Sequence, residues 1–274
     1  MTTSYSTVET ERIGHIERIT LNRPEKHNAL SSQLQEELID AVHAAERDTD
    51  VRVIIVRGAG RSFCAGYDID PRNRSGTQPP LTLEEDVALT ISFGQRWAHV
   101  WNCRVPVIAQ VHGYCIAGGT DLALHCDLVV VADDAEIGFP PVRSMGAPPT
   151  HMWVYHVGPQ WSKRLLLTGD TISGSKAAEI GLAVEAVPAA ELEEHVLALA
   201  HRIANIGHDL LVHNKRVINL GVELMGRSQM QVLAGIHDAL AHQAPEAIAY
   251  SALLRDQGLR AAVAERDAKF GRSG

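Results

Sequence analysis

Short apolar runs alternate with amphipathic segments along the first half of the chain. Residues 5–22 alternate loosely between apolar and polar side chains, which predicts a β-hairpin that ends at Pro24. Residues 31–46 repeat apolar side chains every three or four positions behind Ser31, which predicts a helix with a serine cap. Residues 83–102 predict a second helix, with Leu, Ile, Phe and Trp on one side.

Three unbroken apolar runs lie between or after these helices. They cover residues 51–58, 105–113 and 127–134 and are rich in valine and isoleucine. Continuous runs of this length are typical of parallel strands that are buried on both faces. A short helix is expected over residues 119–126, and the AEIGFPP stretch from residue 135 predicts a fourth short strand. Strands and helices therefore alternate, which predicts an α/β core.

The pattern becomes helical after residue 158. Residues 173–181 have a serine near their start and a glycine at their end, as a short helix would. AVEAVP, residues 183–188, predicts a return to a short strand. Residues 189–270 read as a series of amphipathic helices, and Pro245 occupies the first turn of one of them.

Composition narrows the class of protein. The chain has 274 residues, 45% of them hydrophobic, and a formal net charge of −8 at pH 7, so a general nucleic-acid-binding surface is not expected. No apolar run is long enough to cross a bilayer, and the N-terminus lacks a signal-peptide pattern. Histidine pairs fall five positions apart, a poor spacing for metal ligands on one helix face, so no metal is expected. Four cysteines in apolar contexts are expected to be buried thiols of a cytoplasmic protein: Cys64, Cys103, Cys115 and Cys126.

Two glycine turns carry the candidate chemistry. HGYCIAGGTDLALHCD, residues 112–127, places a glycine pair between an apolar run and a helical pattern, where backbone N–H groups can meet a ligand. It matches neither the GxxxxGK[ST] phosphate loop nor the GxGxxG dinucleotide fingerprint, so its donors suit one oxygen better than a polyanion. A second turn, SFCAGYD at residues 62–68, follows the preceding apolar run. Two strand ends that each supply one N–H would form an oxyanion hole for a thioester carbonyl.

Five ordered motifs now carry a family resemblance: LNRPEKHNALSSQL, RSFCAGYDI, HGYCIAGGTDLALHCD, AEIGFPPV and RLLLTGDTISGSKAAEIGLAVEAV. Together, over about residues 10–225, they resemble the enoyl-CoA hydratase/isomerase (crotonase) superfamily. The resemblance implies an α/β spiral of ββα units over residues 1–200 that binds acyl-CoA. It also implies a helical region over residues 201–274 used to form a homotrimer or a dimer of trimers. The only cofactor-like group would be the coenzyme A of the substrate.

The resemblance also assigns roles to individual positions. The backbone N–H groups of Tyr67 and Gly118 would form the oxyanion hole. Other positions would contact the coenzyme A arm or the acyl head: Arg23, Lys26, Ala65, Gly66, Asp68, Ile69, Asp70 and Lys269, the last beside Phe270. The loop at residues 72–80 and the helix after it are expected to line the acyl pocket. The acyl group itself cannot be named from the sequence.

One position departs from the family pattern. Family hydratases use two carboxylates to add water, and Asp121 matches the first of them, but proline occupies position 141, where the second is expected. Three accounts remain open. Asp121 acts alone as the acid/base in hydration or isomerisation; the site catalyses thioester hydrolysis, decarboxylation or C–C cleavage; or the protein binds acyl-CoA without converting it. Candidate helpers for changed chemistry are Tyr67, Asp68, Arg143 and His151.

Overall fold

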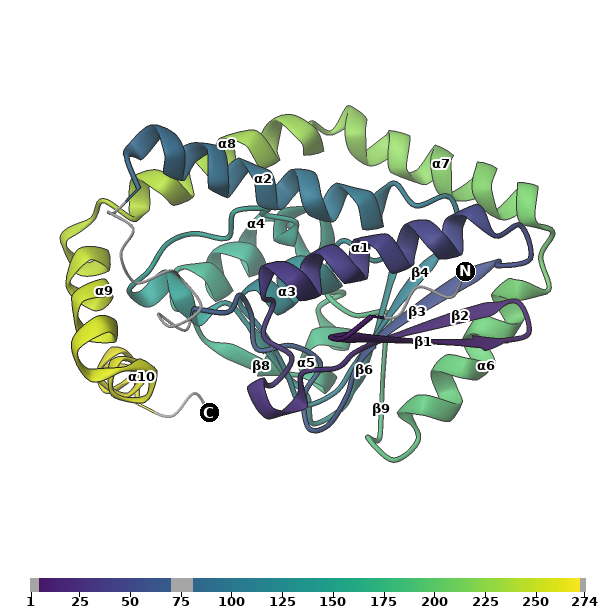
Figure 1. Ribbon diagram of the computed structural model, residues 1–274, viewed down its shortest axis with the longest axis horizontal. Coiled ribbons are helices and arrows are strands. Elements are labelled where there is room, and N and C mark those ends of the chain that lie inside the picture. The colour runs from purple at the N-terminus through teal and green to yellow at the C-terminus, as the bar shows by residue number, and fades with distance from the viewer. Residues whose placement is uncertain (1–4, 70–80, 272–274) are drawn as a thin grey trace.

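A computed structural model describes residues 5–69 and 81–271 of the chain. Its larger sheet has six strands in the order β1-β2-β3-β4-β6-β9 (Figure 1). β1 and β2 form the expected antiparallel hairpin, and each later strand adds in parallel. The strand bounds are Val8–Ile13, Ile16–Leu21, Val53–Gly58, Val107–Val111, Leu128–Ala132 and Glu185–Val187.

The three unbroken apolar runs form the centre of this sheet as β3, β4 and β6, which confirms their prediction as buried strands. Every residue of β4 is buried, and four successive residues of β3, Val53 to Val56, have no exposed surface. A strand with helices on both sides must be apolar on both faces, which is why these runs do not alternate.

A smaller sheet lies beside the larger one and has the order β5-β7-β8. Its strands are Tyr114–Ile116, Glu136–Gly138 and Thr171–Ser173, and a bridge between Cys64 and Cys115 extends it toward the glycine turn at residues 62–68. β4 continues into β5 and β6 continues into β7 after a sharp turn, so the chain repeats a strand, a short strand and a helix. β7 was expected; β5 and β8, at three residues each, were not.

Helices cover the sheets on both sides (Figure 1). Ser31 caps the first of them by accepting a hydrogen bond from the Leu34 N–H, and Thr82 and Glu85 form a capping box at the start of the second. The helices of the α/β body are α1 Ser32–Arg47, α2 Leu83–Trp101, α3 Gly118–Ala123, α4 Trp153–Leu166, α5 Gly174–Glu179 and α6 Leu192–Ala204.

The C-terminal helices lie outside the α/β body. α7 and α8 run along the side of the molecule that carries α2, and α9 and α10 continue to one end of it (Figure 1). α8 packs closely on α2 because Gly235 leaves room there; a Cβ at that position would lie 2.9 Å from the Ile91 backbone nitrogen. Pro245 begins α9, as expected. The bounds are α7 His208–Leu224, α8 Arg227–Ala241, α9 Pro245–Gln257 and α10 Leu259–Asp267.

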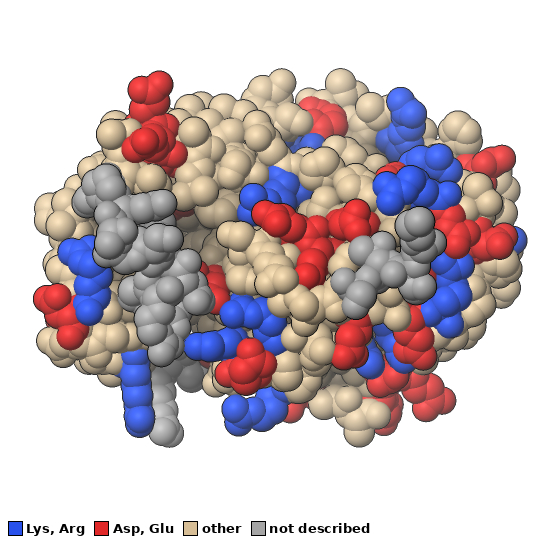
Figure 2. Space-filling model, in the orientation of Figure 1, with Lys and Arg blue, Asp and Glu red and all other residues tan. Residues whose placement is uncertain are grey.

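The surface carries both signs of charge. Figure 2 shows Lys and Arg interspersed with Asp and Glu over one face instead of gathered into one basic area. Within the described parts of the chain, no helix is both long enough and apolar enough to cross a membrane.

Candidate active site

The two glycine turns meet face to face. Gly66 is buried with a φ of 105°, and a Cβ there would lie 2.7 Å from the Cβ of Ala117 and 3.2 Å from the Gly118 nitrogen. A Cβ on Gly118 would lie 2.7 Å from the ring of Tyr67. Only glycine permits both the backbone conformation and these contacts. The turn at residues 62–68 therefore lies directly against the start of α3.

Hydrogen bonds hold the turns but leave two N–H groups unused. The Leu30 N–H donates to the Gly66 carbonyl at 2.8 Å, and the Ala117 N–H donates to the Gly138 carbonyl at 3.0 Å. No acceptor among residues 5–69 and 81–271 takes the backbone N–H of Tyr67 or Gly118. These are the two donors that the resemblance assigned to an oxyanion hole. Gly118 is the first residue of α3, where an N–H has no partner within the helix, and both N–H groups are free to receive a ligand oxygen.

Asp121 lies in the first turn of α3 with 1% of its surface exposed. Its Oδ1 accepts a hydrogen bond from the Thr150 hydroxyl at 2.7 Å, and its Oδ2 accepts one from the Tyr67 phenol at 3.1 Å. The Trp97 indole donates to the same phenol oxygen at 2.9 Å, and the Tyr67 ring stacks on Phe93 with centroids 4.4 Å apart. The carboxyl group is therefore held from both sides.

Burial raises the pKa of Asp121 to about 7, and the hydrogen bonds from Thr150 and Tyr67 oppose that rise. Near neutral pH, both the carboxylic acid and the carboxylate are populated, which suits a group that gives and takes a proton. Burial beside Asp121 raises the pKa of Tyr67 well above its usual range. Tyr67 therefore stays protonated and acts as a hydrogen-bond donor.

His125 supports α3 from behind. Its Nδ1 donates to the Asp121 carbonyl at 2.6 Å, and its Nε2 accepts from the Gln231 side chain of α8 at 2.7 Å. Burial lowers the pKa of His125 to about 3, so the ring stays neutral and fits this donor-acceptor pattern. The helix that carries Asp121 is thereby tied to the C-terminal helices.

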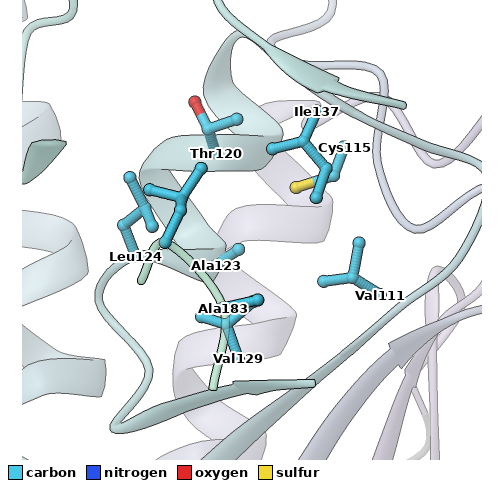
Figure 3. Close-up of a pocket in the computed structure, with 9 residues that line it drawn as sticks. Val111, Cys115, Thr120, Ala123, Leu124, Val129, Ile137 and Ala183 are labelled. Atoms are coloured by element: carbon cyan, nitrogen blue, oxygen red, sulfur yellow. The ribbon is translucent and has the colours of Figure 1, made fainter. Parts of the chain in front are cut away.

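A small cavity behind α3 belongs to the core. Figure 3 shows it between α3 and the sheets, with Val111, Val129 and Ile137 pointing into it from the strands. Thr120 and Leu124 are among the other residues that line it, and no charged side chain does so. No group of His, Cys, Asp and Glu residues within the described ranges could hold a metal ion.

The residues expected to bind coenzyme A differ in their contacts and in their exposure. The Arg23 guanidinium donates to the Asp68 carboxylate at 2.9 Å and to the Ala29 carbonyl, so this pair fastens the glycine turn to the loop before α1. Lys26 and Lys269 are exposed, the first in a 3₁₀ turn and the second beyond α10. Ala65 and Ile69 are half-buried on the glycine turn, and Asp70 and the loop at residues 72–80 lie outside the described residues. Their binding roles stay predictions.

Pro141 lies in a 3₁₀ turn, Pro140–Arg143, where its carbonyl accepts the Ser144, Met145 and Gly146 N–H groups. It supplies no acid. Arg143 is occupied as well: it donates to the Thr168 carbonyl, Asp170 and Asp267 and lies 4.1 Å over the Phe270 ring. Arg143 therefore fastens the end of α10 to this turn.

Sequence reasoning missed Thr150, Trp97, Phe93 and His125. Phe93 and Trp97 reach the site from α2, Thr150 from the segment before α4, and His125 from the residues just after α3. His125 stands within the 112–127 motif, but its position there does not mark a chemical role. Only the apolar side of the helix at residues 83–102 gave a signal, because it placed Phe93 and Trp97 on an inward face.

The chain is similar in sequence and in fold to known proteins. The family model described as Enoyl-CoA hydratase/isomerase matches residues 11–270. A hydroxycinnamoyl-CoA hydratase-lyase from Pseudomonas fluorescens is 36% identical over 203 residues, which cover 73% of each chain. A probable mitochondrial enoyl-CoA hydratase from Dictyostelium discoideum is 31% identical over 80% of this chain and 78% of its own. The crystal structure of an enoyl-CoA hydratase from Mycobacterium smegmatis superposes with a TM-score of 0.92 and 38% identity, covering 98% of this chain and 96% of that one.

Proposed function

Because the chain belongs to the enoyl-CoA hydratase/isomerase family, we propose that it adds water across the C2–C3 double bond of a 2-enoyl-CoA thioester. Membership confirms the resemblance to the crotonase superfamily, and the structural relatives confirm an α/β fold with a helical C-terminal region. The acyl-CoA substrate class follows from the family. The reaction and the role of each residue belong to the proposal.

The observation that carries the proposal is the position of Asp121 beside two unpartnered N–H groups. As water adds, negative charge develops on the thioester oxygen, and the Tyr67 and Gly118 N–H groups would donate to it. One such donor in a preorganised site typically lowers the barrier by ~3 kcal/mol. Two such donors would stabilise the negative charge of an enolate more than the neutral ground state.

Asp121 would supply the proton at C2. In its acid form the carboxyl gives that proton to the enolate, and the Thr150 and Tyr67 hydroxyls stabilise the carboxylate that remains. Tyr67 thus has two parts in the proposal: its N–H faces the thioester oxygen, and its phenol orients Asp121. Trp97 orients the phenol in turn.

A second reaction has one specific observation in its favour. The Pseudomonas fluorescens relative is named a hydratase-lyase, and the 3-hydroxyacyl product of hydration can be cleaved between C2 and C3 by a retro-aldol step. That step uses the same oxyanion donors, because it also leaves an enolate at C2. Cleavage would release an aldehyde and acetyl-CoA. Thioester hydrolysis, decarboxylation and binding without turnover are alternative outcomes of the experiment below.

The partner of this site is an acyl-CoA, with Arg23, Lys26 and Lys269 proposed to meet its coenzyme A part and no resident cofactor. We expect a cytoplasmic homotrimer or dimer of trimers, built on the C-terminal helices. An exposed apolar strip supports this assembly: Val217 is 69% exposed and Leu224 is 90% exposed on α7. Apolar side chains gathered in this way mark contact surfaces.

The test is a turnover assay with crotonyl-CoA, longer 2-enoyl-CoAs and a hydroxycinnamoyl-CoA. The absorbance of the conjugated thioester should fall as the double bond is hydrated. Asp121→Asn should lower the rate of that fall about 10²–10⁴-fold. Asp209→Asn is the matched control, because its side chain is 95% exposed on α7. If the protein binds these thioesters but converts none of them, it is a binding protein. If Asp121→Asn keeps the wild-type rate, the residue assignment is wrong.

A further inference from the structure

Unpartnered polar atoms concentrate in the segment that follows Pro141. Among the described residues, five buried side-chain nitrogen or oxygen atoms lack a hydrogen-bond partner. Three of the five belong to residues 144–153, here called the 144–153 segment: Ser144 Oγ, His151 Nδ1 and Trp153 Nε1. Buried polar atoms in folded proteins nearly always have partners, so a cluster of exceptions suggests a place for a polar ligand or water.

The 144–153 segment also carries Thr150, whose hydroxyl holds Asp121 at 2.7 Å. His151 is the next residue, and consecutive Cα atoms are only about 3.8 Å apart. The backbone of His151 is therefore adjacent to that of the residue that contacts the proposed proton donor. His151 has a φ of 45°, a left-handed conformation that a non-glycine residue keeps only where its surroundings enforce it.

The surroundings do enforce this conformation. Pro148, Pro149 and Thr150 are buried, and the two prolines fix the backbone before His151. The Asp238 carboxylate of α8 accepts the N–H of Ala147. Gly146 lies so close to the same carboxylate that a Cβ would come within 2.2 Å of its Oδ1. The segment is therefore held by α8 at Gly146 and Ala147 and by Asp121 at Thr150.

The other candidate helpers are already engaged. The Tyr67 phenol bonds Asp121 and Trp97. Asp68 pairs with Arg23, and the Arg143 guanidinium is shared among a carbonyl, two carboxylates and a ring. His151 alone among the four has a buried side-chain nitrogen that no other residue bonds. Burial lowers the pKa of His151, so its ring is neutral and able to accept a proton near pH 7.

We propose that His151 is a second catalytic residue, which accepts the proton of the water that attacks C3 and so fills the role left open by Pro141. This inference rests on the proposed hydration. The water oxygen forms a bond to C3 while one O–H bond breaks and its proton moves to the neutral imidazole. The C2–C3 π electrons move to the thioester oxygen, and Asp121 then protonates C2. Proton return from the imidazolium to the Asp121 carboxylate through water restores the site, with a 3-hydroxyacyl-CoA as the only product.

The first test is chemical rescue. His151→Ala should hydrate the best 2-enoyl-CoA about 10²–10⁴ times more slowly than the wild type, with a similar melting temperature. Added imidazole should restore part of that rate in proportion to its neutral form. His151→Gln, which keeps a polar side chain without the ability to accept a proton, should stay as slow. His201→Ala, an exposed change on α6, is the control.

A partial reaction separates this inference from the proposed function. Exchange of the C2 protons of butyryl-CoA with D2O needs Asp121 and the two N–H groups but no attacking water. His151→Ala should therefore slow hydration far more than it slows exchange. Wild-type-like hydration by His151→Ala or by His151→Gln would overturn the role of His151 and leave the proposed function intact. A wild-type protein that neither exchanges nor hydrates would overturn both.

Discussion

The hydrogen bond from Thr150 to Asp121 offers a sharp test of how the site is tuned. The Thr150 hydroxyl donates to Oδ1 at 2.7 Å in a fully buried setting. A donor of this kind stabilises the carboxylate more than the carboxylic acid, and it opposes the rise that burial imposes on the pKa of Asp121. Thr150→Val removes the donor with little change in volume.

The magnitude follows from the strength of that contact. A hydrogen bond to a charged group contributes about 1.5–3 kcal/mol, and about 1.4 kcal/mol corresponds to one pKa unit. Loss of the donor should therefore raise the pKa of Asp121 from about 7 by about 1 to 2. Because Asp121 must be protonated to give its proton to C2, the rate falls as pH rises through this pKa. In Thr150→Val the alkaline limb should consequently lie at higher pH.

The assay is the hydration rate between pH 5 and pH 10, beside a carboxyl titration of the free protein by infrared or NMR spectroscopy. Thr150→Ser keeps the hydroxyl and should keep the wild-type profile. Thr171→Val removes an exposed hydroxyl that contacts Glu136 and controls for a general effect. An alkaline limb that stays in place or moves to lower pH in Thr150→Val would refute the reasoning.

Three further predictions follow from the same contacts. Burial raises the pKa of Asp121 from its ordinary 3.8 to about 7, so ionisation costs stability as pH rises through that range and none at lower pH. In urea unfolding at pH 8, the free energy of unfolding of Asp121→Asn should therefore exceed that of the wild type by at most about 4 kcal/mol. At pH 4 the two free energies should be nearly equal. Equal free energies at both pH values would contradict the raised pKa. Gly66→Ala should lower the hydration rate at least tenfold through its clash with the facing turn, whereas Gly14→Ala, also at a positive φ but in open space, should not. Arg143→Ala should free the end of α10 by removing a partner of Asp267, and limited proteolysis should then cleave the C-terminus faster; an unchanged cleavage rate would mean that other contacts hold it.

The sequence predicts long elements better than short ones. β3, β4 and β6 follow from apolar runs, and α1 and α2 follow from a 3.6-residue period that lasts more than four turns. β5 and β8 have three residues each, too few to establish a period. β5 forms where the chain turns after β4, and β8 forms where the chain after α4 pairs with β7. Tertiary context, not local propensity, determines such strands.

The candidate site likewise has residues that the sequence predicts and residues that it does not. The facing glycine turns and Asp121 stand in contiguous motifs, so their meeting at Gly66 and Gly118 could be predicted. Thr150 and Trp97 reach Asp121 and Tyr67 from positions 29 and 30 residues away, through contacts that no local pattern encodes. These contacts, and the burial that shifts the pKa of Asp121, arise only when the layers pack.

Hydration of a 2-enoyl-CoA in D2O tests the central claim most directly. The product's mass and NMR spectrum report whether a solvent-derived proton reaches C2, and the initial rate reports whether Asp121 carries it. The account predicts a 3-hydroxyacyl-CoA with one deuterium at C2 from the wild type, and a rate about 10²–10⁴ times lower from Asp121→Asn. Formation of the same labelled product at the wild-type rate by Asp121→Asn would contradict it.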